Sequence, residues 1–152
     1  MNEFAGPPVD PAADLHADLD GAFGLPAWGS RLRVGTSMAL NFGQPLPDKT
    51  QRGQWRLSIR YAAWRIETPD AVLAGSEDTR EEMERAIAML DGKVLIDADI
   101  DLPSLSATFF FADSTRLRTF CHSRDDDHWV LFRPDGKARV IGPNYSWTLM
   151  PE

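Results

Sequence analysis

Residues 54–67, QWRLSIRYAAWRIE, carry the pattern that decides the fold class. Apolar and polar side chains alternate along the first part of this stretch, the period of two that is typical of a strand with one buried face. The apolar positions are Trp55, Leu57, Ile59, Tyr61 and Ala63. Ala62, Trp64 and Ile66 then reverse the polarity. This reversal indicates either a bulge or a strand whose far end is covered on both faces.

Strand patterns recur at short spacing along the rest of the chain. They occupy residues 31–42, 70–75, 93–102, 105–113, 116–122, 128–142 and 145–150, and Pro134-Asp135-Gly136 forms the turn of a hairpin within 128–142. Taken together, the patterns predict an α+β protein with an antiparallel sheet of about seven to eight strands.

One helix is predicted at about 78–91, packed on that sheet. Its apolar stripe at helical spacing is Met83, Ala86, Ile87 and Leu90. Asp78 and Glu81 form a capping box at its start, with Ser76 as the rival cap, and Gly92 ends it.

The first 30 residues differ in composition from the body of the chain. Residues 1–11 are rich in proline, and we expect them to be mobile. Leu15, Leu19 and Phe23 then lie four apart, which is compatible with a short helix docked on the body or with a disordered acidic arm. We therefore divide the chain into a flexible acidic arm, residues 1–30, that carries a short helix, and one α+β domain, residues 31–152.

Charge and composition limit the classes of partner and the compartment. The formal net charge is −7, yet residues 31–65 hold seven basic residues and one acid, which is +6. Because the field of the whole molecule opposes a polyanion, we expect no nucleic-acid partner. The single Cys121 excludes an internal disulfide, and no apolar run approaches the length of a membrane span. With no signal peptide visible, we expect a cytoplasmic protein with no membrane partner.

Asp97, Asp99 and Asp101 alternate with apolar residues and resemble the opening of a calcium loop. A calcium loop needs a glycine at its sixth position and a glutamate at its twelfth, but Leu102 and Thr108 stand there. We expect these aspartates to line the wet face of a strand. If that strand lies beside the one that carries Arg56 and Arg60, the charges pair across it; otherwise the aspartates are available to a partner.

Cys121, His122 and His128 offer a thiol and two imidazoles without the spacing of a zinc site or of a nucleophile with its base. We therefore predict no catalytic residues, no metal, no cofactor and no enzymatic activity.

The segment HSRDDDHW, residues 122–129, places three aspartates between two predicted strands. Asp125, Asp126 and Asp127 are either the solvated tip of a hairpin or an acidic projection that meets a basic groove on a partner. His128 is counted with them as a contact. Among the tryptophans, Trp28 and Trp147 are candidate interface anchors, with burial at the edge of the core as the alternative.

The second half of the chain resembles a set of small bacterial α+β proteins that includes immunity proteins encoded beside polymorphic toxins. The resemblance covers about residues 53–149 and rests mainly on turn and core positions, so it transfers no catalytic residue. The positions that carry it are Leu90, Gly92, Val94, Phe111, Leu117, Phe120, Trp129, Leu131 and the turn at 134–136.

This resemblance implies a small cytoplasmic protein that binds and blocks a cognate toxin, such as a basic nuclease. We accordingly expect an immunity-type protein that acts by stoichiometric binding. A non-enzymatic adaptor or assembly protein is the first alternative, and a small-molecule-binding domain or enzyme is the second.

Overall fold

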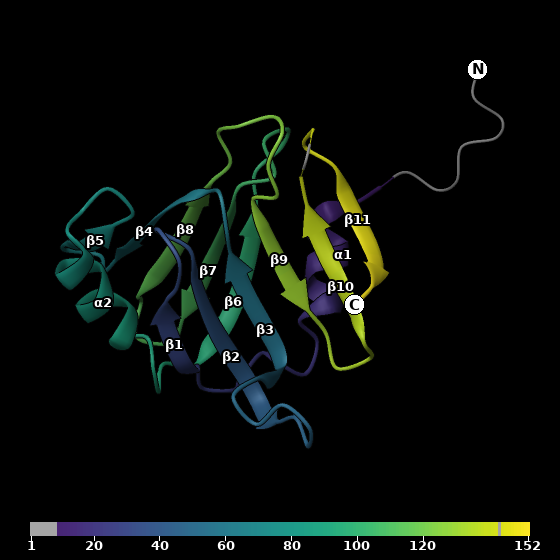
Figure 1. Ribbon diagram of the computed structural model, residues 1–152, viewed down its shortest axis with the longest axis horizontal. Helices are drawn as coiled ribbons and strands as arrows, with labels where there is room; N and C mark the ends of the chain where they lie inside the picture. Colours follow the sequence, from purple (N-terminus) through teal and green to yellow (C-terminus); the bar gives the residue numbers. More distant parts are fainter. Residues whose placement is uncertain (1–8, 143) are drawn as a thin grey trace, which may run out of the picture.

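The computed structural model describes residues 9–142 and 144–152, in which two antiparallel sheets face each other (Figure 1). The first sheet has six strands in the order β1-β2-β3-β9-β10-β11. Its strands are β1 (Trp28–Leu32), β2 (Met38–Pro45), β3 (Gly53–Ile59), β9 (Trp129–Phe132), β10 (Lys137–Ile141) and β11 (Trp147–Pro151). The second sheet has five strands in the order β5-β4-β8-β7-β6. Its strands are β4 (Ala63–Glu67), β5 (Val72–Gly75), β6 (Leu95–Ile100), β7 (Ala107–Phe111) and β8 (Arg116–Phe120).

The antiparallel α+β class is confirmed, whereas the prediction of one sheet with about seven to eight strands is wrong. The described residues hold eleven strands and two helices. The patterns at 31–42 and 54–67, each of which reads as one strand in the sequence, correspond to β1 with β2 and to β3 with β4. Two smaller sheets bury more apolar surface between them than a single sheet could cover with one short helix.

The core lies between the two sheets. Phe109 of β7 meets Trp129 of β9 edge to face, with the ring centroids 5.8 Å apart. Leu57 and Ile59 of β3 and Ile66 of β4 are also fully buried there. Alternation along each strand turns every second side chain toward this core and the others toward the outer face of the sheet.

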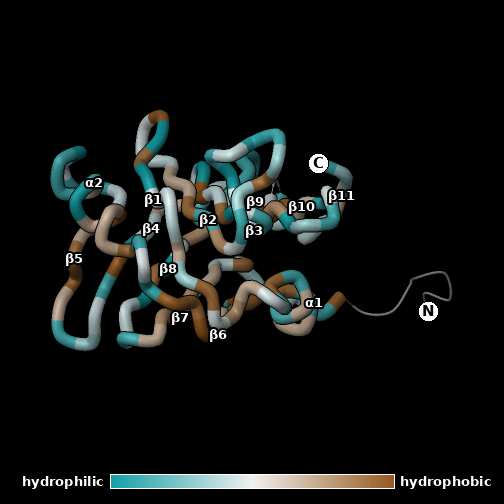
Figure 2. The backbone as a smooth tube through the Cα atoms, turned by 90° about the horizontal axis from the view of Figure 1, so that it is seen from below, coloured by the Kyte–Doolittle hydropathy of each residue, from teal (hydrophilic) through white to brown (hydrophobic). Residues whose placement is uncertain are grey.

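Helix α1 (Pro11–Asp18) lies in the layer of the second sheet, beside its edge strand β6, and covers the inner face of β10 and β11 (Figure 2). Asp10 caps it and Pro11 occupies its first turn. Leu15 and Leu19 belong to the common core. Asp18 is buried and accepts hydrogen bonds from Arg133 and Arg139, so a paired carboxylate fixes the helix to the first sheet. The mobility expected of residues 1–11 falls mostly outside the described residues.

Helix α2 (Arg80–Ala88) contacts one edge strand of each sheet, β1 of the first and β5 of the second. Its predicted stripe is buried, but the predicted cap is wrong. Thr79 caps the helix by accepting a hydrogen bond from the Glu82 amide, while Asp78 accepts one from the Gly75 amide in the preceding turn. The helix therefore begins two residues later than 78 and, at nine residues, is shorter than predicted. No helix among the described residues is long and apolar enough to span a membrane.

The polarity reversal at residues 60–63 reflects neither a bulge nor cover on both faces, because the chain passes from one sheet to the other there. Strand β3 ends at Ile59 in the first sheet, and β4 begins at Ala63 in the second. The polarity reverses because the core lies on opposite sides of the two strands. Tyr61, predicted to face the core, lies in the crossing and is 62% exposed.

Candidate functional site

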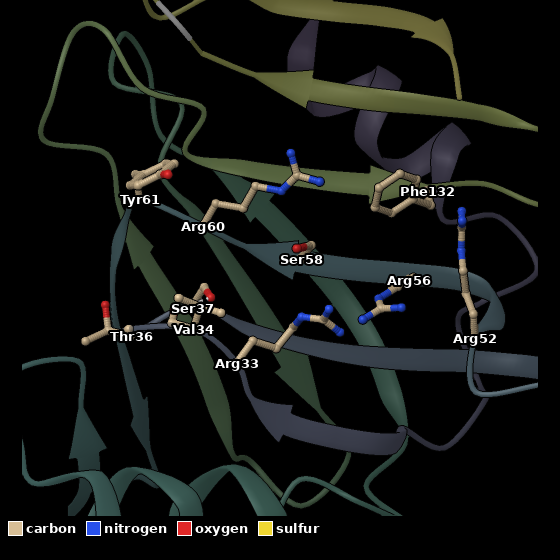
Figure 3. Close-up of a pocket in the computed structure, with 11 residues that line it drawn as sticks. Arg33, Val34, Thr36, Ser37, Arg52, Arg56, Ser58, Arg60, Tyr61 and Phe132 are labelled. Atoms are coloured by element: carbon tan, nitrogen blue, oxygen red, sulfur yellow. Dashed lines mark hydrogen bonds between the residues drawn. The ribbon is translucent and has the colours of Figure 1, made fainter.

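The outer face of the first sheet carries an open groove of about 770 Å³ (Figure 3). We call it the basic groove. Its charged lining is Arg33, Arg52, Arg56 and Arg60, and its remaining side chains include Ser37, Ser58, Tyr61 and Phe132. Two smaller recesses beside it add Arg31, Lys49 and Arg80. Most of the basic block noted in residues 31–65 thus gathers on one surface.

Strand alternation places part of this lining. Along β3, the inward positions Trp55, Leu57 and Ile59 are buried, so Arg56 and Ser58 must face outward. Phe132 of β9 stands directly opposite Arg56 in the register. The floor of the groove is therefore a rigid pair of hydrogen-bonded strands.

The connection between β1 and β2 supplies Arg33. This loop is held from two sides: the Trp64 indole N–H donates to the Thr36 carbonyl at 2.7 Å, and Arg80 donates to the Gly35 and Arg33 carbonyls, each at 3.1 Å. Its path is thus fixed by side chains from the second sheet and from α2. Arg33 is thereby set on the rim of the groove, facing the strand that carries Arg56 (Figure 3).

The charges in the groove are only partly compensated. Arg52 is ion-paired with Glu152, and Arg60 with Asp127 at 3.6 Å. Among the described residues, neither Arg33 nor Arg56 has a carboxylate within ion-pair distance. The groove therefore holds two uncompensated cations close together.

The charged form of Arg56 is disfavoured by its surroundings in the groove. Burial, followed by repulsion from the neighbouring arginines, of which Arg33 contributes most, lowers the pKa of Arg56 to about 10. The guanidinium is still charged at neutral pH, so the folded protein retains unfavourable charge–charge energy at this position. An anion bound here would relieve it, and the planar guanidinium fork suits a carboxylate or a phosphate.

The acidic loop, residues 122–128, is not the tip of a hairpin. It connects β8 of the second sheet to β9 of the first, so it crosses between layers. Its backbone runs beside the crossing at 60–61, where the Arg60 and Tyr61 amides donate to the His128 and Asp127 carbonyls. The sequence suggested a hairpin because strand patterns flank the loop, but those strands do not pair with each other.

The predicted contact residues of this loop differ in accessibility. Asp125 is exposed, Asp126 accepts a hydrogen bond from Ser123 at 2.8 Å, and Asp127 is held by Arg60. His128 has no exposed surface, and its ring stacks on Tyr145 with the centroids 5.5 Å apart. Asp125 and Asp126 are exposed, so these two carboxylates of the predicted set remain accessible to a partner.

The two candidate tryptophan anchors lie at the edges of the core. Trp28 is half-buried and donates to the Gly43 carbonyl at 2.8 Å. Trp147 donates to Asp14 at 2.9 Å and meets Trp129 edge to face. With their N–H groups satisfied inside the protein, both side chains help to fix the fold.

The aspartates of β6 do not pair with Arg56 or Arg60, because β6 and β3 belong to different sheets. Asp97 instead accepts a hydrogen bond from His16 at 2.9 Å, which raises the pKa of that histidine. Asp99 and Asp101 are exposed at the edge strand of the second sheet and just beyond it.

Cys121 is buried, and this burial raises the pKa of its thiol to about 11. The thiol is therefore protonated at neutral pH and a poor nucleophile. Among residues 9–142 and 144–152, no group of three or more His, Cys, Asp or Glu side chains could hold a metal ion.

The sequence contained part of the signal for the basic groove. The local charge of residues 31–65 and the outward positions of Arg56 and Arg60 were visible, but the approach of Arg33 and Phe132 depends on strand pairing.

A comparison with protein-family models, curated proteins and solved structures gave no significant match.

Proposed function

We propose that the protein is an immunity-type binding protein, and that its basic groove receives acidic side chains of the toxin that it neutralises. The observation that carries this proposal is the pair Arg33 and Arg56, two uncompensated cations in a concave site. Unlike an exposed aspartate, which water solvates at little cost, Arg56 is half-buried among other cations. Charge that opposes stability in this way is typical of binding sites.

The backbone that carries the two cations of the groove is fixed before a partner binds. Strand pairing fixes Arg56, and the hydrogen bonds from Trp64 and Arg80 fix the loop that carries Arg33. A backbone that is already ordered loses less conformational entropy when it binds, and this favours a tight complex.

The acidic remainder of the molecule fits the same role. Asp125 and the aspartates of the 66–101 sector remain exposed and can meet basic side chains of the toxin, a nuclease for example. Such contacts would chiefly accelerate association, while carboxylates bound in the groove would slow dissociation. A toxin with both acidic and basic side chains at its interface could contact the basic groove and the exposed aspartates together.

The test is capture from the native host with the immobilised protein. Arg33→Gln/Arg56→Gln removes the two uncompensated cations, and Arg85→Gln/Arg116→Gln removes two cations from α2 and from the second sheet as a matched control. We expect the first variant to lose a toxin partner that the wild type and the control retain in equimolar amounts. Equal capture by all three would contradict the proposal. A partner without toxic activity would favour the adaptor alternative.

A small anionic ligand is the second candidate, since about 770 Å³ lies within the usual range for ligand pockets, roughly 300–1,000 Å³. Titration calorimetry with inorganic phosphate and with nucleoside triphosphates separates the two candidates. Micromolar binding that Arg56→Gln abolishes and Arg116→Gln preserves would favour the small molecule.

A further inference from the structure

The outer face of the first sheet continues past the basic groove into a second recess of about 470 Å³. Arg60 and Phe132 line both hollows, so the two adjoin. In the strand register, Arg56 stands beside Phe132, Phe132 beside Ala138, and Ala138 beside Met150. One row across four strands therefore runs from a cation to aliphatic side chains.

The next row adds two valines to this surface. Ser58 of β3 stands beside Val130, Val130 beside Val140, and Val140 beside Thr148. The floor of the second recess is thus aliphatic, with Met150 exposed at its far side. We call it the aliphatic recess. A ligand that fills both hollows must be anionic at one end and apolar at the other.

The chain itself shows which anions the arginines accept. Glu152 places its carboxylate on Arg52, and Asp127 places its own on Arg60, at the boundary of the two hollows. Glu152 follows the end of a strand, with its amide bonded to the Gly136 carbonyl, so this carboxylate is presented by extended chain. Arg33 and Arg56 offer the same chemistry, and neither has an ion-paired carboxylate among the residues that the structure describes.

We propose that the occupant is an extended peptide segment of the partner protein, with an acidic residue on Arg33 and Arg56 and an aliphatic residue in the aliphatic recess. This inference rests on the proposed function and specifies the partner segment. Neighbouring strands lie about 4.8 Å apart, so β3 and β10 are separated by about 10 Å. An extended chain advances about 3.3 Å per residue, so about three residues separate the acidic position from the aliphatic one.

The lining favours a peptide over single-stranded nucleic acid. Nucleic-acid grooves combine cations with open aromatic faces on which bases stack. Two aromatic rings line the basic groove, and the guanidinium of Arg52 already lies over the Phe132 ring, 4.3 Å from its centroid, so Tyr61 is left as a single open aromatic face. The neighbouring hollow offers aliphatic groups, which suit an aliphatic side chain better than a charged sugar-phosphate chain.

Fluorescence anisotropy with synthetic ligands tests this inference on the full chain. The first probe is a labelled peptide with two glutamates and, about three residues later, a leucine and a valine. Matched probes replace the aliphatic residues with serine or the glutamates with glutamine, and an oligothymidine of similar length represents nucleic acid. The protein variants are Arg56→Gln, Thr148→Glu/Met150→Glu in the recess, and Arg116→Gln as the control.

We expect the acidic–aliphatic peptide to bind about tenfold more tightly than either matched peptide, a free-energy difference of about 1.4 kcal/mol. Arg56→Gln should weaken both glutamate peptides, Thr148→Glu/Met150→Glu should abolish the advantage of the aliphatic residues, and Arg116→Gln should change neither. Equal affinity for the serine peptide would overturn the recess as a contact while leaving the groove in place. Tighter binding of oligothymidine, or no binding of any peptide, would overturn the inference, whereas the proposed function is judged separately by capture from the host.

Discussion

Arg60 and Asp127 form an ion pair, 3.6 Å between Nη1 and Oδ2, that ties the acidic loop to the basic groove. Each side chain is more than a third exposed, so the pair adds little stability. Its main effect is on the charge of the groove, because Asp127 neutralises one of the four arginines that line it.

Asp127→Asn should therefore free Arg60 and strengthen the binding of an acidic peptide about threefold, a change of about 0.6 kcal/mol, which is within the range for an exposed pair. The melting temperature should hardly change. Affinity measured by anisotropy at low salt checks this, with Asp125→Asn as the control because Asp125 is exposed two residues earlier in the same loop. Weaker binding by Asp127→Asn would show that the acidic loop itself contacts the ligand.

Arg56→Gln should stabilise the free protein while it weakens binding. Removing a half-buried cation whose pKa is lowered to about 10 relieves both desolvation and repulsion. Because water screens much of this energy, we expect a gain of up to about 1 kcal/mol in the free energy of unfolding at low salt. Urea denaturation at low and high salt measures it, and the gain should shrink as salt screens the arginines. A clear loss of stability would mean that Arg56 supports the fold.

Ile87→Asp should destabilise the protein by at least about 3 kcal/mol, because it places a charge where α2 meets the core. Ile87 is fully buried, whereas Ala88, the next residue, is exposed. Ala88→Asp is therefore the matched control and should cost less than about 1 kcal/mol. Thermal unfolding followed by circular dichroism compares them, and similar melting temperatures would show that α2 is not docked.

Acid should destabilise the protein partly through His128. Burial is the main cause that lowers the pKa of this imidazole below its usual value near 6.5. The unfolded chain thus binds a proton more readily, and stability is lost as the pH falls below about 6.5. In wild type, His128 should contribute a slope of up to about 1 kcal/mol per pH unit to the free energy of unfolding, and His128→Gln should remove that contribution.

Denaturation curves of wild type and His128→Gln between pH 7.5 and 5 measure the difference in slope. The pKa of His16 is raised by Asp97, so its contribution has the opposite sign, but it is present in both proteins and cancels in the comparison. Parallel stability curves would show that His128 titrates normally.

The sequence predicts the local parts of this structure well and its long-range parts poorly. Trp55, Leu57 and Ile59 face the core as their alternation predicts, because one strand is enough to set that pattern. The passage between sheets at residues 60–62 reads in the sequence only as a reversal of polarity. Distinguishing it from a bulge requires knowing that β3 pairs with β9 while β4 pairs with β8.

The candidate site shows the same division. Three adjacent aspartates attract attention in a sequence, yet Asp127 is paired and His128 is buried. Arg33 and Arg56 lie 23 positions apart in the chain and become neighbours of one groove only through the β1–β2 loop. Clusters formed by strand pairing leave no local signal except the excess of basic residues in the segment.

Surface plasmon resonance with the captured partner tests the basic groove most directly. The three proteins compared are wild type, Arg33→Gln/Arg56→Gln and Arg85→Gln/Arg116→Gln. Circular dichroism first establishes that all three proteins are folded. We predict that loss of the two groove cations raises the dissociation rate at least about tenfold, while the control dissociates like wild type. Equal dissociation rates for all three proteins would contradict the assignment of the basic groove as the binding site.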